Sequence, residues 1–316
     1  MDYKPSLLFK NGHFNTIYSF LFTKAKKLEY KRITIDTPDQ DILDLDLALV
    51  GSDTLVILVH GLDGSSNVPY VSNLAHRLNE EGIDALALNQ RNCSGRPNKF
   101  YRSYHSGKTE DLQTTIEYVL DKFDYKKIVL CGLSLGGNLV LKYVGEKGEK
   151  IDSNIYSAIG ISVPCNLKDS AFHLDKGFNK VVYLDRMISS LNKKLLIKSK
   201  EFPSKGVSKQ EIRKIKNFTD FDNAYTGPAN GYPDAEAYWK DNSCIHYIKN
   251  CAIPTLLLNA LDDPFLPASS YPYEIIKANP FLTMETPKHG GHVGFRSSFA
   301  SSKRYFEDRV VQLINS

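Results

Sequence analysis

Apolar and polar residues follow two different periods along the chain. Residues 32–49 contain two runs around a turn, "RITIDTPD" and "ILDLDLAL", and the second alternates apolar and acidic side chains strictly. Period-two alternation is typical of antiparallel strands with one exposed face, so we expect a half-exposed hairpin there. The strands expected further on are mostly unbroken apolar runs, at residues 54–60, 84–89, 127–132, 157–163, 254–260 and 282–286. Such runs are typical of parallel strands buried on both faces.

Segments with the apolar spacing of helices lie between several of these strands, at residues 70–81, 109–123 and 138–147. Because strands and helices alternate, the sequence predicts an α/β fold with a mostly parallel central sheet and antiparallel strands at its start. Residues 165–250 break the alternation, since they contain helical patterns and a Gly/Pro loop but no clear buried strand. We interpret them as a helical cap inserted into a single domain that spans residues 1–316.

The first 30 residues are the only segment in which a targeting signal needs consideration. Their apolar residues are interrupted by Lys10, Asn11, His13 and Asn15, so the continuous core of a signal peptide is missing. We therefore interpret residues 1–30 as an N-terminal arm folded onto the domain. No run reaches the roughly 18 apolar residues of a membrane-spanning helix, and we expect no stable membrane insertion.

Composition narrows the class of partner and the compartment. The net charge of the 316 residues is +4, which is too small to indicate a nucleic-acid partner. The five cysteines include no Cys-x-x-Cys pair, which favours a reduced, cytoplasmic protein. Nine lysines and arginines gather within residues 193–216. We interpret this run as a solvated helical face, with a weak contact between the basic cap and an anionic lipid surface as the alternative.

A serine between glycines stands where an apolar run gives way to a helical pattern. In "GLSLGG" (132–137), Ser134 follows the expected strand 127–132. Ligands of a parallel sheet bind at the carboxyl ends of its strands. A sharp turn from strand to helix exposes the serine hydroxyl there and points helix amides at the same place. The pattern G-x-S-x-G is weak alone, but in this context it favours a nucleophile over a plain tight turn.

A serine nucleophile needs a base to take its proton and a carboxylate to orient the base. In this fold the three residues follow in the order Ser, Asp, His, at the ends of later strands. Asp263 and His292 follow the last two expected strands and are our candidates. Asp262 and His289 are alternatives for the same two roles. The two histidines are spaced H-x-x-H, but no further ligands are grouped with them, so we expect no metal ion.

Acyl chemistry also requires donors for an oxyanion. The segment "HGLDGSS" (60–66) follows the expected strand 54–60, where the first donor belongs in this fold. We expect the backbone N–H groups of Leu62 and Leu135 to form the oxyanion hole. His60 is interpreted as structural, with its ring bonded to nearby backbone.

Together these motifs resemble the α/β-hydrolase family, and more narrowly its YheT-like branch, which is related to the animal ABHD lipid hydrolases. The resemblance covers almost the whole chain, through "NGHFNTIY", "VHGLDGSS", "RNCSGRPN", "YHSGKTEDL", "GLSLGGN", "NALDDPF" and "HGGHVGF". It implies Ser134, Asp263 and His292 as the charge-relay set, and carboxylester hydrolysis without a cofactor. Asn92 replaces the usual glycine of the family, which leaves the shape of that loop open.

The leading hypothesis is a serine hydrolase that cleaves short- to medium-chain acyl esters, with a small-molecule ester or lipid as substrate and monoacylglycerol-like esters among the candidates. The alternatives are a thioesterase or acyltransferase that uses the same three residues, and a non-catalytic binding protein that retains the fold. The sequence reveals no broad apolar surface, and the expected lid is basic. We therefore expect soluble esters of about four to eight acyl carbons to be the best substrates.

Overall fold

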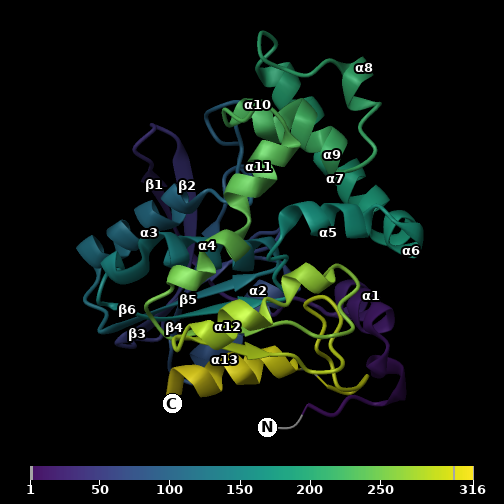
Figure 1. Cartoon of the computed structure of the whole chain (residues 1–316). Coiled ribbons are helices and arrows are strands. Elements are labelled where there is room, and N and C mark those ends of the chain that lie inside the picture. Colours follow the sequence, from purple (N-terminus) through teal and green to yellow (C-terminus); the bar gives the residue numbers. More distant parts are fainter. Residues whose placement is uncertain (1–2, 302, 316) are drawn as a thin grey trace.

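The computed structural model describes residues 3–301 and 303–315 and is built around one eight-stranded sheet (Figure 1). The strands are β1 (Lys31–Asp36), β2 (Ile42–Ala48), β3 (Thr54–Val59), β4 (Asp84–Asn89), β5 (Lys127–Leu133), β6 (Ile155–Ile161), β7 (Thr255–Leu258) and β8 (Leu282–Glu285). They lie in the order β1-β2-β4-β3-β5-β6-β7-β8. Pairing is antiparallel from β1 to β4 and parallel from β4 to β8, which confirms the predicted sheet.

Helices cover both faces of the sheet, and for this reason the central strands are apolar without interruption. Successive residues of β3 point to opposite faces. Leu55 and Ile57 belong to the core that includes residues of α3 (Thr109–Lys122) and α4 (Leu135–Lys147). Val56 and Leu58 belong to the core on the other face, with α2 (Pro69–Glu80) and α13 (Tyr305–Asn315). The expected helices 70–81 and 109–123 are thereby confirmed.

The hairpin β1–β2 differs from the expected half-exposed pair. Asp44 and Asp46 of β2 are only 4% and 1% exposed, although they alternate with leucines. Arg32 of β1 donates two hydrogen bonds of 2.7 Å to Asp46, and Asp44 pairs with Arg96 of the loop after β4. The prediction of an exposed acidic face was therefore wrong, because that loop covers the face and supplies a partner for the charge of Asp44.

The segment between β6 and β7 is helical, and we call its helices from α5 to α11 the cap. They are α5 (Leu167–Leu174), α6 (Gly177–Asn179), η3 (Lys180–Leu184), α7 (Asp185–Glu201), α8 (Lys209–Ile212), α9 (Phe218–Phe221), η4 (Asp222–Thr226), α10 (Gly227–Ala229) and α11 (Ala235–Asn242). Figure 1 shows most of them above the sheet. The expected Gly/Pro loop at residues 225–239 is largely helical, since η4, α10 and α11 occupy it.

The N-terminal arm is folded onto the domain as η1 (Leu7–Lys10) and α1 (Gly12–Phe22). In Figure 1, α1 lies next to α6 at the right of the molecule. Short helices complete the chain: η2 (Gly148–Lys150), η5 (Cys244–His246), η6 (Ile248–Asn250), η7 (Ala268–Ser270) and α12 (Tyr273–Ala278). Within residues 3–301 and 303–315, no helix combines the length and apolarity that crossing a bilayer requires.

Candidate active site

Ser134 occupies the sharp turn between β5 and α4. Its backbone has φ 55° and ψ −123°, a region that side-chain-bearing residues rarely adopt. The turn is tight because two glycines touch backbone. A Cβ at Gly132 would lie 2.2 Å from the Gly136 carbonyl oxygen, and one at Gly136 would lie 2.2 Å from that of Val59. These contacts explain why α4 begins at Leu135, three residues before the helical pattern becomes visible in the sequence.

A continuous chain of hydrogen bonds links Ser134 to a histidine and an aspartate. His292 Nε2 lies 2.9 Å from Ser134 Oγ, and His292 Nδ1 lies 2.9 and 3.1 Å from the two carboxylate oxygens of Asp263. Asp263 is 5% exposed and also accepts a hydrogen bond from the Phe265 N–H. The Phe265 ring stacks on the imidazole, with 4.0 Å between centroids. The structure thus brings together the three residues that the sequence selected.

The alternative acid and base form a separate pair. His289 Nδ1 lies 3.4 Å from a carboxylate oxygen of Asp262, and the other oxygen accepts a hydrogen bond from the Gly291 N–H. Neither Asp262 nor His289 makes a hydrogen bond to Ser134 in the described part of the chain. The two histidines of the H-x-x-H pattern therefore contact different carboxylates. Across the described residues, no three His, Cys, Asp or Glu side chains gather as ligands of a metal ion would.

The inward face of α1 supports the His292 loop, a role that the sequence analysis missed. Thr16 Oγ1 accepts a hydrogen bond of 2.8 Å from the His292 N–H and donates one to the Gly12 carbonyl. Gly12 itself packs so closely that a Cβ there would lie 1.8 Å from the Asp262 carbonyl oxygen. The only signal for this role was the segment "NGHFNTIY" among the family motifs, because the contact between Thr16 and His292 spans 276 positions.

Leu62 and Leu135, the expected oxyanion donors, lie next to the same cavity as Ser134. Both residues line the cavity that contains Ser134 and His292. Neither N–H has an acceptor among the described residues, since Leu135 begins its helix and Leu62 lies in the loop after β3. The next residue, Asp63, has φ 56°, and its N–H donates to the Tyr104 hydroxyl at 2.7 Å. That bond fixes the loop beside Leu62.

His60 has the structural role expected for it. Its Nδ1 lies 2.7 Å from the Gly61 carbonyl oxygen, and its Nε2 accepts a hydrogen bond of 3.1 Å from the Gln90 N–H. Burial lowers the pKa of His60 to about 4, so the ring is neutral at pH 7. A neutral ring with both nitrogens engaged serves to join the ends of β3 and β4.

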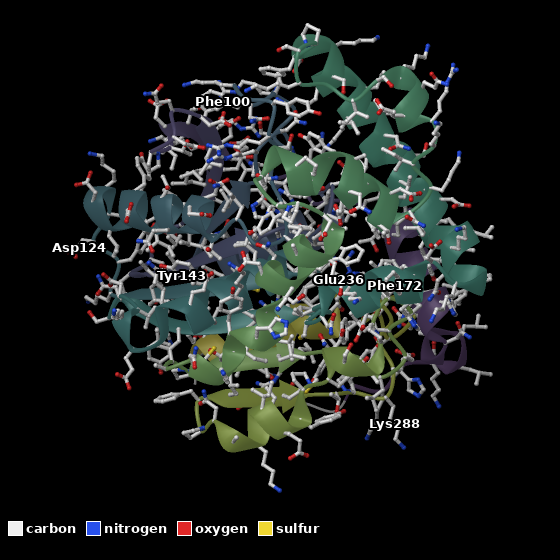
Figure 2. The ribbon with its side chains drawn as sticks, turned by 45° about the horizontal axis from the view of Figure 1, so that its top comes forward. Phe100, Asp124, Tyr143, Phe172, Glu236 and Lys288 are labelled. Atoms are coloured by element: carbon white, nitrogen blue, oxygen red, sulfur yellow. The ribbon has the colours of Figure 1, made fainter. Side chains whose placement is uncertain are left out.

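A cavity of about 710 Å³ opens beside Ser134, between the sheet, the cap and α1. Leu191, Leu195 and Tyr183 of the cap line it. Some other large apolar residues of the cap lie elsewhere: Leu184 is fully buried, Leu196 packs in the cap core, and Phe172 (labelled in Figure 2), Phe178 and Ile197 are 41–57% exposed. The cavity therefore has an apolar wall made by α7 and its neighbours.

The basic run 193–216 is not uniformly solvated, in contrast to its predicted role. Lys194 lines the cavity and forms an ion pair with Asp63, next to the Leu62 amide. Lys198 is 2% exposed and donates to the carbonyls of Asn98 and Phe100 at 3.0 and 2.7 Å. Two of the nine basic residues thus attach α7 to neighbouring loops. Lys198 is buried because backbone oxygens are within reach of its ammonium group, and Lys194 is partly buried beside the carboxylate of Asp63.

Asn92 stands where the resemblance to the hydrolase family implies a glycine, and its backbone conformation accounts for the replacement. Its φ is 64°, which lies in the left-handed region. Asparagine tolerates this conformation better than most residues, because its short polar side chain interacts with local backbone. The loop therefore keeps a backbone shape that glycine would also adopt.

Comparison with known proteins identifies the family of this chain. Residues 54–297 match a family model described as alpha/beta hydrolase fold. YheT of Escherichia coli, which is named as an esterase, is 29% identical over 93% of this chain and 87% of that protein. Phospholipase ABHD3 of Homo sapiens is 27% identical over 98% of this chain and 77% of that protein. An esterase structure from Pyrococcus furiosus superposes with a TM-score of 0.60 at 18% identity, covering 91% of this chain and 92% of that one. The chain therefore belongs to the α/β-hydrolase family, and its relatives are YheT and the ABHD enzymes.

Proposed function

We propose that this protein is a serine hydrolase that cleaves carboxylic esters of short- to medium-chain acyl groups. The observation that carries the proposal is the chain of hydrogen bonds from Asp263 through His292 to Ser134, at the edge of an apolar cavity. The esterase and phospholipase names of the relatives YheT and ABHD3 support ester chemistry in particular.

In the first half of the proposed reaction, Ser134 Oγ attacks the ester carbonyl carbon while His292 Nε2 takes the hydroxyl proton. The carbonyl oxygen becomes an oxyanion, and the free N–H groups of Leu62 and Leu135 are its donors. The tetrahedral intermediate then expels the alcohol, which receives the proton from His292. The product that remains is an acyl ester of Ser134.

In the second half, water takes the place of the alcohol. His292 removes a proton from the water as it attacks the acyl carbon, and the same two amides stabilise the second oxyanion. Collapse of this intermediate returns the proton to Ser134 Oγ and releases the carboxylic acid. No cofactor is required in either half.

Asp263 and Phe265 hold the imidazole in position for both halves. The buried carboxylate of Asp263 accepts a hydrogen bond from the Nδ1–H group, which keeps the proton on Nδ1 and leaves Nε2 unprotonated and facing Ser134. Its negative charge stabilises the imidazolium that forms when Ser134 loses its proton. Phe265 covers one face of the ring and restricts its rotation.

The test is labelling with a fluorophosphonate probe, which reacts with activated serine nucleophiles. We expect wild-type protein to be labelled and Ser134→Ala to remain unlabelled. Ser134→Ala should also lose about 10⁴–10⁶-fold in kcat on p-nitrophenyl butyrate, while its unfolding temperature stays close to that of wild type. Labelling that persists in Ser134→Ala, or the absence of labelling in folded wild type, would contradict the proposal.

A further inference from the structure

The N-terminal helix α1 buries polar residues and exposes apolar ones, the opposite of a usual surface helix. Its buried residues are glycine or polar: Gly12, Asn15, Thr16 and Ser19. Its outward residues are mostly aromatic or aliphatic, and Phe20, Leu21 and Phe22 are 64%, 53% and 63% exposed. A surface helix of a water-soluble domain normally points its apolar stripe at the core.

The inward polar residues have specific partners in the structure. The Asn15 side chain donates to the Arg296 carbonyl and accepts from the Arg296 N–H, both at 3.1 Å. Thr16 Oγ1 accepts a hydrogen bond from the His292 N–H. The inward face of α1 is thus occupied by hydrogen bonds to the His292 loop and the residues after it. Phe14 and Tyr18 pack against Phe9 and Phe299. The exposed apolar end of the helix, Phe20 to Phe22, has no such burial and requires another explanation.

The apolar surface of α1 continues onto neighbouring elements. We define the apolar rim as the exposed residues Leu7, Leu8, Phe20, Leu21, Phe22, Phe178 and Val181, which are 52–81% exposed. The Phe178 ring, from α6, contacts His13 of α1 with 4.7 Å between centroids. Both views show α1 and α6 side by side (Figures 1 and 2). Exposed apolar residues that gather in this way mark an interaction surface.

Two residues of the rim also belong to the cavity wall. Phe20 and Leu21 are more than half exposed and also line the cavity that contains Ser134. Arg186 of α7 lines the same cavity, and its guanidinium lies 4.7 Å from the centre of the Phe20 ring. The apolar rim and the cavity are therefore continuous at Phe20 and Leu21.

The arm around the rim is basic. Residues 3–28 contain five lysines and no aspartate or glutamate. In the described part of the chain, the side chains of Lys10, Lys24 and Lys27 form no ion pair, whereas Lys26 lies 3.6 Å from Glu80. Exposed aromatic and aliphatic residues among unpaired lysines are typical of segments that lie on anionic membranes.

We propose that the apolar rim docks this protein onto an anionic lipid surface. Phe22, Leu21 and the cap residue Val181 enter the interfacial layer, and the lysines of the arm contact lipid phosphates. The combination of charge and apolar exposure favours lipid over a second copy of the chain, because two copies would bring the same lysines together. Docking itself does not depend on the proposed function. If that function holds, the substrate should also enter the cavity from the lipid, and only this second expectation rests on it.

The test measures flotation of Ser134→Ala protein with vesicles, so that no ester is consumed. Binding should be strong to phosphatidylcholine with phosphatidylglycerol at about three to one, and weak to phosphatidylcholine alone. In the same background, Phe22→Ser with Val181→Ser should lower the partition coefficient about tenfold or more, since neither side chain lines the cavity. The matched control is Val50→Ser with Phe281→Ser. These residues are 50% and 44% exposed and lie where the parallel strands β4 and β8 begin, at the other end of the strands from Ser134.

A second pair of variants tests the charges. Replacing Lys10, Lys24 and Lys27 by Gln should reduce binding to the anionic vesicles at least tenfold. The same change at Lys150, Lys249 and Lys277 alters net charge equally and should have a much smaller effect. Equal losses in both triple variants, or in both serine pairs, would overturn the proposal.

Two further outcomes would also overturn it. One is the absence of flotation with either kind of vesicle. The other is a dimer in light scattering that disappears in Phe22→Ser with Val181→Ser, because the rim would then bind a second copy. Flotation without fluorophosphonate labelling of wild type would contradict the proposed function and leave the docking surface intact, so the two failures are distinguishable.

Discussion

Two neighbouring aspartates, Asp262 and Asp263, have different partners, and the chemistry depends on which one faces His292. Asp263 accepts a hydrogen bond from His292 Nδ1, whereas Asp262 lies beside His289. We expect Asp263→Asn to lower kcat about 10⁴-fold, because an amide neither stabilises the imidazolium nor holds its tautomer. Asp262→Asn should cost less than about tenfold. Steady-state kinetics on p-nitrophenyl butyrate measures both, and a reversed ranking would show that the acid is Asp262.

Sequence order predicted the candidate triad, but it did not predict the residues that support it. Ser134, Asp263 and His292 each follow a strand, so the topology alone brings them to one edge of the sheet. Thr16 lies in a segment with no periodic signal, and its contact with His292 depends on how the arm folds over the finished domain. Local patterns carry no information about such a contact.

Thr16 is a positioning residue for His292. Thr16→Val keeps the shape of the side chain but removes the acceptor of the His292 N–H, and an unsatisfied buried donor costs about 1–3 kcal/mol. We expect kcat to fall about tenfold or more, with KM little changed, because the loop that carries His292 becomes less ordered. Thr16→Ser restores the acceptor and should restore most of the rate. Equal losses in both variants would indicate a packing role alone.

Among the elements, the strands buried on both faces were predicted well, whereas for those at the edge formed by β1 and β2 the pairing was predicted but the burial was not. The run from Leu55 to Val59 is apolar because both faces of β3 are covered, so its pattern is unambiguous. The pattern of β2 also revealed two different faces. It did not reveal that Arg32 and the loop with Arg96 bury the acidic one. The same limitation applies to α1, whose polar face turns inward.

The helix η4 of the cap contains a buried acid whose ionisation opposes folding. Asp222 accepts a hydrogen bond of 2.8 Å from Trp239 Nε1, and burial raises its pKa to about 6. Because this pKa lies above the unfolded value of about 3.9, the folded state binds the proton more tightly. The contribution of Asp222 to stability is thus fully present below about pH 4 and is lost as the pH rises through 6.

Asp222→Asn should remove this dependence, since an amide keeps the acceptor without a charge. We expect the variant to exceed wild type by about 2 kcal/mol in free energy of unfolding at pH 7, and by little at pH 4. Urea denaturation at the two pH values measures the difference. A gain of equal size at both would mean that the effect does not come from ionisation of Asp222.

At the scale of the whole molecule, the cavity and the rim together bear on which esters are cleaved. The expectation of soluble substrates rested on a surface without exposed apolar residues, and the rim around Phe20 and Phe22 removes that premise. The length of the acyl chain is a separate question, because under the proposed function we expect the acyl group to bind beneath the cap. Leu191 and Leu195 form part of its wall there.

We therefore expect the cavity, and not the solubility of the ester, to limit the length of the acyl chain that is cleaved efficiently. Each buried methylene contributes about 0.8 kcal/mol, so two to four additional carbons should raise kcat/KM by one or two decades. We expect kcat/KM for p-nitrophenyl esters to peak at about four to eight acyl carbons and then to fall, because a longer chain extends beyond the wall of α7 into water. The Phe22→Ser, Val181→Ser variant should have the same profile on dissolved esters, since both side chains lie outside the cavity. A rate that still climbs at about twelve carbons would show that the cavity continues along the rim, so that the acyl chain and the lipid surface share one site.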